Sequence, residues 1–281
     1  MDKGCVVAAL PKAQVICVIK RTKHPVNILG ASILLWLSFS IWAPAQAYVL
    51  HTWDLTLSGV EMGNVGGSGN YYSYNTAIGG VAPLEVSGWS NQGSDSVLVD
   101  AQANLRTDGM GSCNRNDDFV IDLGFFVWTL NCEDISSAAV ENNEEQDWLL
   151  IYLPGENANE WQSIDLLPFE GADVDVTYWV GNISSPSDLN GYDYGAAGDF
   201  TSIGFGSRVD VDNVNVNDNP VSIDLTLQPN IGNAILIGGN FDQADDGFLA
   251  VSVTALVPIP PAIWLFVSAI GALAARRKIA A

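Results

Sequence analysis

Short stretches in which apolar and polar residues alternate run through the chain from residue 48 to residue 256. Because successive side chains of a strand point to opposite faces, this period of two predicts half-buried β-strands. The stretch "WLLIYL" (148–153) is apolar throughout, which predicts a central strand covered on both faces. The residues expected to share a face are Trp53, Leu55 and Leu57; Ala82, Leu84 and Val86; Val97, Val99, Ala101 and Ala103; Val174, Val176, Tyr178 and Val180; Val221, Ile223, Leu225 and Leu227; and the segment 248–256.

Turn-forming residues separate these stretches, as in "GNVGGSG", "SNQGSD", "GNISSPSDLNGYDYGAAG" and "NVNDNP". No part of 48–256 has a helical period over three turns, and the sequence has no evident internal repeat. Many short strands separated by Gly, Asn and Asp are typical of an antiparallel β-sandwich, of which the jelly roll is one form. We therefore expect one all-β domain over residues 48–256, flanked by an apolar helix near each end of the chain.

The N-terminal end has the layout of a secretory signal peptide. A basic region (1–23) precedes an apolar stretch (28–42) and a small-x-small site at Ala45 and Ala47. The apolar stretch is shorter than the roughly 20 helical residues that cross a membrane. We expect residues 1–47 to use Sec-type export machinery and signal peptidase to cleave before Tyr48, an uncleaved anchor being the alternative. The basic region is unusually long, so the natural start could lie downstream of Met1.

Charge is divided sharply between the ends and the middle of the chain. The net charge is −21, and all of the 32 acidic residues except Asp2 lie in 48–256, where the only cations are Arg106, Arg115 and Arg208. Such a surface repels phosphate backbones and anionic lipids, so we expect no nucleic-acid partner. An acidic surface is typical of a protein kept soluble in an external medium.

Cys113 and Cys132 are the two cysteines that remain after export. Because the compartments outside the cytoplasm are oxidising, an even count predicts a disulfide between them. Closing a loop of about 20 residues stabilises a fold by about 3 kcal/mol in the chain-entropy model. A metal site is the alternative, but the sequence has no CxxC and no histidine near either cysteine.

Signals for catalysis and for metal binding are weak. His51 is the one histidine of 48–256, and we expect it to face solvent or to be hydrogen-bonded rather than to serve a catalytic triad. The carboxylate clusters "DVDNVNVNDN" (210–219) and "DQADDG" (242–247) leave calcium open as a ligand, although neither has the spacing of a calcium loop. Paired carboxylates can also hydrolyse glycosidic bonds, with Trp161 and Trp179 as candidate stacking surfaces for sugar. We predict no catalytic residues, no zinc site and no cofactor.

The chain closes with "VPIPPAIWLFVSAIGALAARRKIAA" (257–281). Residues 262–275 carry no charge and would be about 21 Å long as a helix, against about 30 Å of hydrocarbon in a bilayer. Three prolines before this stretch resist extension of the helix beyond its first turn. The segment is therefore a marginal membrane span, with the cations at 276–278 held on the cytoplasmic side.

This tail resembles the C-terminal sorting signal of PEP-CTERM proteins. That signal combines a proline motif, an apolar helix and a terminal arginine pair, and Ile259 between two prolines is similar to its VPLP variant. The resemblance implies an exosortase-like processing enzyme in a Gram-negative bacterium that makes exopolysaccharide. The protein would pass through the inner membrane by this helix to the cell surface or matrix. The matching positions are Val257, Pro258, Pro260, Trp264, Leu265, Phe266, Ser268, Gly271, Arg276 and Arg277.

The middle of the chain is similar to a family of exosortase-dependent surface proteins. The ordered landmarks are "GMGSCN" (109–114), "AVENNEEQDWLLIYLP" (139–154) and "ADVDVTYW" (172–179). Ala139 stands where the family has His, and Glu141 where it has Asp. The family has no established catalytic residues, so the resemblance informs the expected localisation and fold of the protein rather than its activity.

Three hypotheses follow for the domain 48–256. The first is a structural or matrix-associated surface protein without enzymatic activity. The second is a carbohydrate-binding or glycoside-active protein that works on exopolysaccharide. The third is a calcium-stabilised adhesin, which requires a melting temperature that rises with calcium and falls with a chelator.

Overall fold

The computed structural model describes residues 48–56, 59–62, 71–75, 82–91, 96–113, 119–122, 127–130, 139–142, 146–155, 159–169, 174–195, 197–212, 219–226, 230–243 and 246–259. For 60–62, 113, 119–122, 127–130 and 141 it describes the backbone alone. The chain divides into two compact units, Met1–Ala45 and Gln46–Ala281. The first unit and the final residues, with the helices expected there, lie outside the described residues.

The described part of the second unit is built from antiparallel strands, as the alternation predicted. Its helices are two short 3-10 turns, η3 (Pro186–Leu189) and η4 (Thr201–Ile203), and no helix within the described ranges has the length and apolarity to cross a membrane. The strands are β1 (Tyr48–Asp54), β2 (Val60–Met62), β3 (Tyr71–Tyr74), β4 (Leu84–Asn91), β5 (Leu98–Leu105), β6 (Met110–Cys113), β7 (Phe119–Asp122), β8 (Val127–Leu130), β9 (Val140–Glu141), β10 (Asp147–Tyr152), β11 (Glu160–Pro168), β12 (Val176–Gly181), β13 (Val209–Val211), β14 (Val221–Asp224), β15 (Ala234–Gly239) and β16 (Gly247–Pro258).

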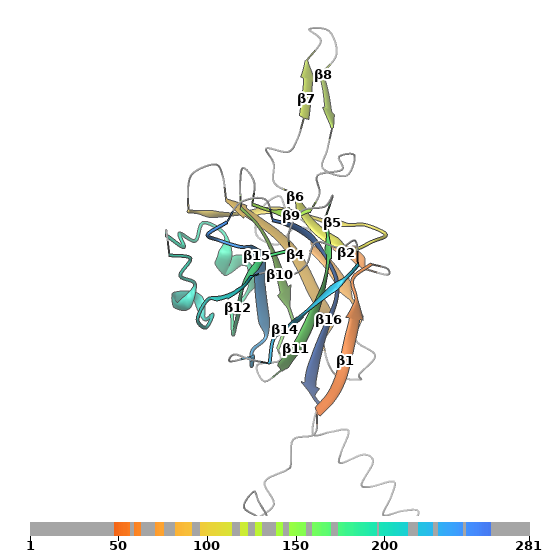
Figure 1. The fold of residues 1–281 in the computed structure, drawn as a ribbon, viewed down its shortest axis with the longest axis vertical. Coiled ribbons are helices and arrows are strands. Elements are labelled where there is room, and N and C mark those ends of the chain that lie inside the picture. The colour runs from red at the N-terminus through yellow and green to blue at the C-terminus, as the bar shows by residue number, and fades with distance from the viewer. Residues whose placement is uncertain are drawn as a thin grey trace, which may run out of the picture. The chain divides into compact units, whose positions relative to one another are not determined.

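Fourteen of these strands form one antiparallel sheet that nearly closes into a barrel-like shape (Figure 1). Its main order is β13-β12-β15-β10-β4-β5-β6-β16-β11-β14, with β1 and β9 paired to β16 and with β2 and β3 continuing from β4. Strands β7 and β8 pair only with each other.

Strand β5 connects two groups of strands in this sheet. One group is β2, β3, β4, β10, β12, β13 and β15, and the other is β1, β6, β9, β11, β14 and β16. Its first half pairs with β4, Ala101 opposite Gly88, and its second half pairs with β6, Gln102 opposite Cys113. The strand changes partner in the middle, so its burial pattern departs from strict alternation: Leu98 and Asp100 are buried beside Ala101 and Ala103. The prediction of a strand at this position is confirmed; of the residues expected to share a face, Ala101 and Ala103 are buried, and Val97 and Val99 are half-buried.

The main core fills the interior between the two strand groups. Large side chains there come from both groups, including Trp53 of β1, Trp161 of β11, Tyr178 of β12 and Phe248 of β16. The aligned valines and leucines expected on one face of β12 and β14 lie in the same core, among them Val176 and Ile223. Burial of each such side chain stabilises the fold by about 1.5–3 kcal/mol.

A second core covers the opposite face of β4, β10, β12 and β15. The segment 182–205, which contains η3 and η4, places Leu189, Tyr194 and Phe200 against that face. Strand β10 is therefore buried at every residue, and it pairs with β15 on one side and β4 on the other. This confirms the prediction from "WLLIYL" of a central strand covered on both faces.

Candidate functional site

The two ends of the described domain are neighbouring residues of the same ladder. Strand β1 begins at Tyr48 and pairs with β16 in the register Tyr48 to Pro258 and Val49 to Val257. Tyr48 is the predicted first residue after signal-peptide cleavage, and Val257 and Pro258 open the predicted sorting signal. Strand β16 thus runs two residues beyond the expected domain limit at 256, and Val257 is completely buried. The remaining predicted processing residues (Ala45, Ala47 and those from 260 onward) lie outside the described residues.

The outer face of β1, β16, β11 and β14 begins, at this end, with a row of aliphatic side chains and one carboxylate. Leu50 pairs with Leu256, Leu256 pairs with Glu160, and Glu160 forms a bridge with Ile231. Directly paired residues project to the same side of a sheet. Leu50 is 61% exposed, Ile231 54% and Tyr48 37%, and these are the exposed large hydrophobic side chains of the described part of the chain. We call Tyr48, Leu50, Leu256, Glu160 and Ile231 the end row.

The next row along the strands carries hydroxyl groups. Thr52 pairs with Thr254, and their Oγ1 atoms lie 2.9 Å apart in a hydrogen bond. Thr254 is in turn opposite Ser163, and Ser163 is opposite Asp224. This hydroxyl row is two residues further along β1 than the end row.

The third row alternates carboxylates with hydroxyl groups. Asp54 is opposite Ser252, and Ser252 is opposite Asp165. The Ser252 hydroxyl donates to Asp165 Oδ2 at 2.6 Å, and Asp54 Oδ1 accepts from the backbone N–H of Thr56 at 2.9 Å. Along the direction of the strands the outer face therefore changes from a row with three aliphatic side chains to two polar rows of hydroxyl and carboxylate side chains.

His51 lies on the inner side of β1, next to the end row. Its ring meets the Trp53 ring edge-on, with centroids 4.5 Å apart and an interplanar angle of 83°. The residue is half-buried, where the sequence favoured a solvent-facing or hydrogen-bonded side chain. Desolvation by this burial lowers the pKa of His51 below 6.5.

A polar cluster joins β9 to the loop between β15 and β16. Asn142 Nδ2 lies 2.8 Å from the carbonyl oxygens of Asn240 and Gln243 and 2.9 Å from Asp246 Oδ2. Asn142 Oδ1 accepts from the backbone N–H of Asp246 at 3.0 Å. One amide side chain therefore fixes the loop that contains the predicted "DQADDG" cluster.

Arg208 joins the two acidic clusters. Its Nε donates to Asp210 and its guanidinium Nη2 to Asp242, both at 2.7 Å, and the guanidinium lies 4.8 Å from the centre of the Phe241 ring. Asp210 also accepts from Thr177 Oγ1 at 2.7 Å. Across the described residues, no three histidine, cysteine or carboxylate side chains gather as a metal site requires. Of the carboxylates in these clusters, Asp210, Asp242 and Asp246 are among those that the structure describes, and each accepts hydrogen bonds from protein donors.

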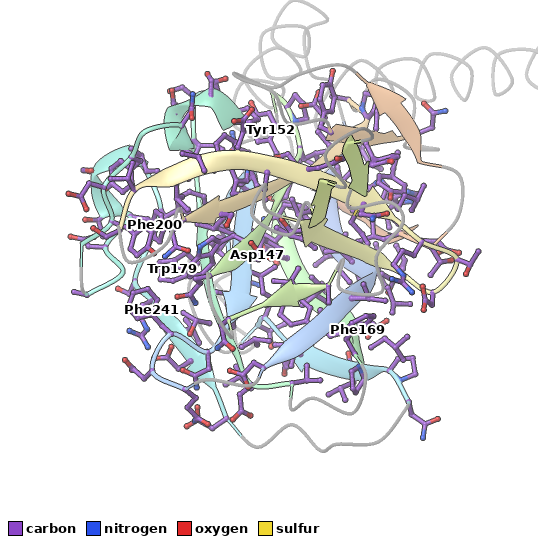
Figure 2. All side chains as sticks on the ribbon, turned by 90° about the horizontal axis from the view of Figure 1, so that it is seen from above. Asp147, Tyr152, Phe169, Trp179, Phe200 and Phe241 are labelled. Carbon is purple, nitrogen blue, oxygen red and sulfur yellow. The ribbon has the colours of Figure 1, made fainter. Side chains whose placement is uncertain are left out.

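The tryptophans that suggested sugar stacking are buried. Trp161 is fully buried, with its Nε1 donating to the carbonyl of Gly232 at 3.1 Å, and Trp179 is 1% exposed. Figure 2 shows Trp179, Phe200 and Phe241 on one side of the domain, and the Trp179 and Phe200 rings are 4.8 Å apart. Burial raises the pKa of Tyr194 in the same cluster to about 12. These rings are core, so neither Trp161 nor Trp179 presents a face to a sugar ring.

The predicted disulfide stays a prediction. Cys113 is the last residue of β6, with only its backbone described, and Cys132 lies outside the described residues.

Comparisons with protein-family models, with curated proteins and with solved structures each find no match for this chain.

Proposed function

We propose that this chain is an exported, non-enzymatic protein of the cell surface or extracellular matrix of a Gram-negative bacterium. In this proposal its C-terminal segment acts as a PEP-CTERM sorting signal of the VPLP type, read by an exosortase-like enzyme. Exopolysaccharide is the proposed environment of the mature domain, and the domain needs no cofactor.

One structural observation supports removal of both ends. Every described strand pairing lies between Tyr48 and Pro258, and these two residues are partners at the end of one ladder. Cleavage before Tyr48 and beyond Ile259 would therefore break none of the described strand pairs. A domain that keeps all of its described strand pairs after both cuts suits a protein that is cleaved once on export and once more on delivery.

A structural role is supported by how the polar residues of the domain are used. Arg208 and Asn142 tie carboxylates and carbonyls of separate loops together, and five of the tryptophans belong to the two cores. We also propose that the two strand groups are the layers of a β-sandwich, since the main core draws on both groups and β5 connects them. The jelly roll remains the specific form to test.

The proposal is tested by the intact mass of protein recovered from the outside of cells. The host carries or lacks an exosortase, and the control is a variant with Arg276→Ala and Arg277→Ala. We expect the exported protein to begin at Tyr48 and to lack Trp264 and the cations at 276–278 only when both the exosortase and the arginines are present. External protein that keeps those residues in the exosortase host contradicts the proposal and makes the chain a tail-anchored envelope protein.

A further inference from the structure

We propose that the end row lies against the surface of a zwitterionic lipid bilayer while the C-terminal segment is inserted in that bilayer. This inference rests on the proposed function, since it needs the segment after Ile259 to occupy a membrane before it is removed. The occupant of the surface is the headgroup layer, and the contact gives the domain a defined orientation before processing.

The position of the exposed apolar residues is the first argument. Soluble domains carry scattered exposed apolar side chains, whereas a gathered group indicates a contact surface. In the described part of this domain the three exposed large hydrophobic residues, Tyr48, Leu50 and Ile231, all lie at the end where β16 finishes. Tyrosine with aliphatic neighbours is the composition found where proteins meet the membrane interface.

The second argument is the length of chain between the end row and the apolar segment. Pro258 is paired with Tyr48, and the uncharged stretch begins at Ala262, four residues later. Four residues span at most about 14 Å. A helix of about 21 Å is shorter than the hydrocarbon core, so its insertion also draws the flanking chain toward the bilayer. The end of the sheet is therefore held within or next to the headgroup layer.

The third argument is the gradient along the outer face. From Leu50 to Asp54 the strand advances four residues, about 14 Å, and the rows change from mainly aliphatic side chains to hydroxyl and carboxylate side chains. This order matches the change from interface to water when the strands stand upright on the membrane. A face that contacted another protein along its length would not require a gradient in this direction.

Charge selects the kind of lipid. Glu160 belongs to the end row, and Asp54 and Asp165 lie further up the same face. Carboxylates so close to the surface are repelled by anionic headgroups, which makes a zwitterionic surface the better partner. A second copy of the chain, paired through the β1 edge, is the competing occupant.

The experiment uses the chain produced in a host without exosortase, which retains its tail, reconstituted in phosphatidylcholine nanodiscs. A photoreactive benzoylphenylalanine replaces Leu50, Ile231 or, as the control, Ser222, which lies in the third row opposite Asp165. Leu50, Ile231 and Ser222 are all exposed, so these replacements leave the core intact. We expect lipid adducts at positions 50 and 231 to exceed those at 222 at least fivefold, and to fall when anionic lipid is added.

Co-purification with the nanodisc reports insertion of the tail independently of the adducts. Protein that stays with the nanodisc but gives equal lipid adducts at 50, 231 and 222 overturns the inference and leaves the proposed function standing. A protein–protein adduct from position 50 as the main product also overturns it, in favour of a second copy. Protein that does not stay with the nanodisc overturns both the inference and the membrane step of the proposed function.

Discussion

Replacing Asn142 by aspartate changes one atom of the side chain, yet it should be among the most damaging substitutions in the domain. The amide nitrogen lies within 2.9 Å of three oxygens, one of them in the Asp246 carboxylate, which is 2% exposed as a residue. In ionised Asn142→Asp an oxygen takes the place of the donor, so three acceptors face a fourth; in the protonated form one O–H replaces the two N–H donors of the amide.

The magnitude follows from two competing costs. Two ionised carboxylates 2.9 Å apart repel by about 6 kcal/mol at an effective dielectric constant of about 20. If the new aspartate takes up a proton at pH 7 instead, this costs about 4 kcal/mol for a carboxyl of ordinary pKa near 3.9. Protonation is the smaller cost and therefore prevails, and the one hydrogen bond lost in the protonated form adds about 1 kcal/mol. We expect Asn142→Asp to lower the free energy of unfolding by about 5 kcal/mol at pH 7 and by only about 1–2 kcal/mol at pH 4.

Urea unfolding followed by tryptophan fluorescence at the two pH values measures both numbers. Gln243→Glu is the matched control, because it adds the same charge on an exposed side chain of the loop that Asn142 contacts and should cost under about 0.5 kcal/mol. If Asn142→Asp is as stable as the control at pH 7, the packing of this amide among three oxygens is refuted. If its cost is the same at pH 4, the electrostatic reasoning fails.

Three further predictions concern the sheet. Gly238→Ala should destabilise the domain by at least about 1–3 kcal/mol in the same urea assay, since a Cβ there would lie 2.4 Å from the Trp148 ring. His51 has a lowered pKa, so its contribution to stability is complete above pH 6.5 and is lost as the pH falls. His51→Gln should flatten the dependence of the free energy of unfolding on pH between pH 6.5 and 5, and an unchanged slope counts against the burial of His51. Burial raises the pKa of Glu85 above 4.5, so ionisation of Glu85 opposes folding as the pH rises; Glu85→Gln should raise the melting temperature at pH 7 and have little effect near pH 4, as calorimetry can show.

Local patterns predicted the strands well, because burial against one interior imposes a period of two. The continuous apolar run of β10 was enough to place it centrally, and the long alternation at 248–256 became β16. The strand β16 ends two residues beyond the predicted limit of the domain, because Val257 and Pro258 were assigned to the sorting signal although they pair with Val49 and Tyr48. The uneven burial along β5 could not be predicted from the alternation, because the change of partner within this strand depends on the whole sheet.

The sequence did not predict that the segment 182–205 covers one face of the sheet. Glycine, serine and aspartate there were interpreted as turns, whereas Leu189, Tyr194 and Phe200 close one face of the sheet. The spacing of its aromatic residues was the available signal. The end row could not be predicted from the sequence either, because Leu50, Leu256 and Ile231 come together only through the register of the strands.

The pairing of Tyr48 with Pro258 also decides how the domain bears mechanical load. A pull that separates the two chain ends acts across the ladder, so it opens the β1–β16 hydrogen bonds one pair at a time from the end inward. A pull through residue 259 against the body of the domain instead acts along β16, which is paired with β1 on one side and β11 on the other, and loads all those bonds together. The domain should therefore resist being dragged by its tail far better than being peeled apart at its ends.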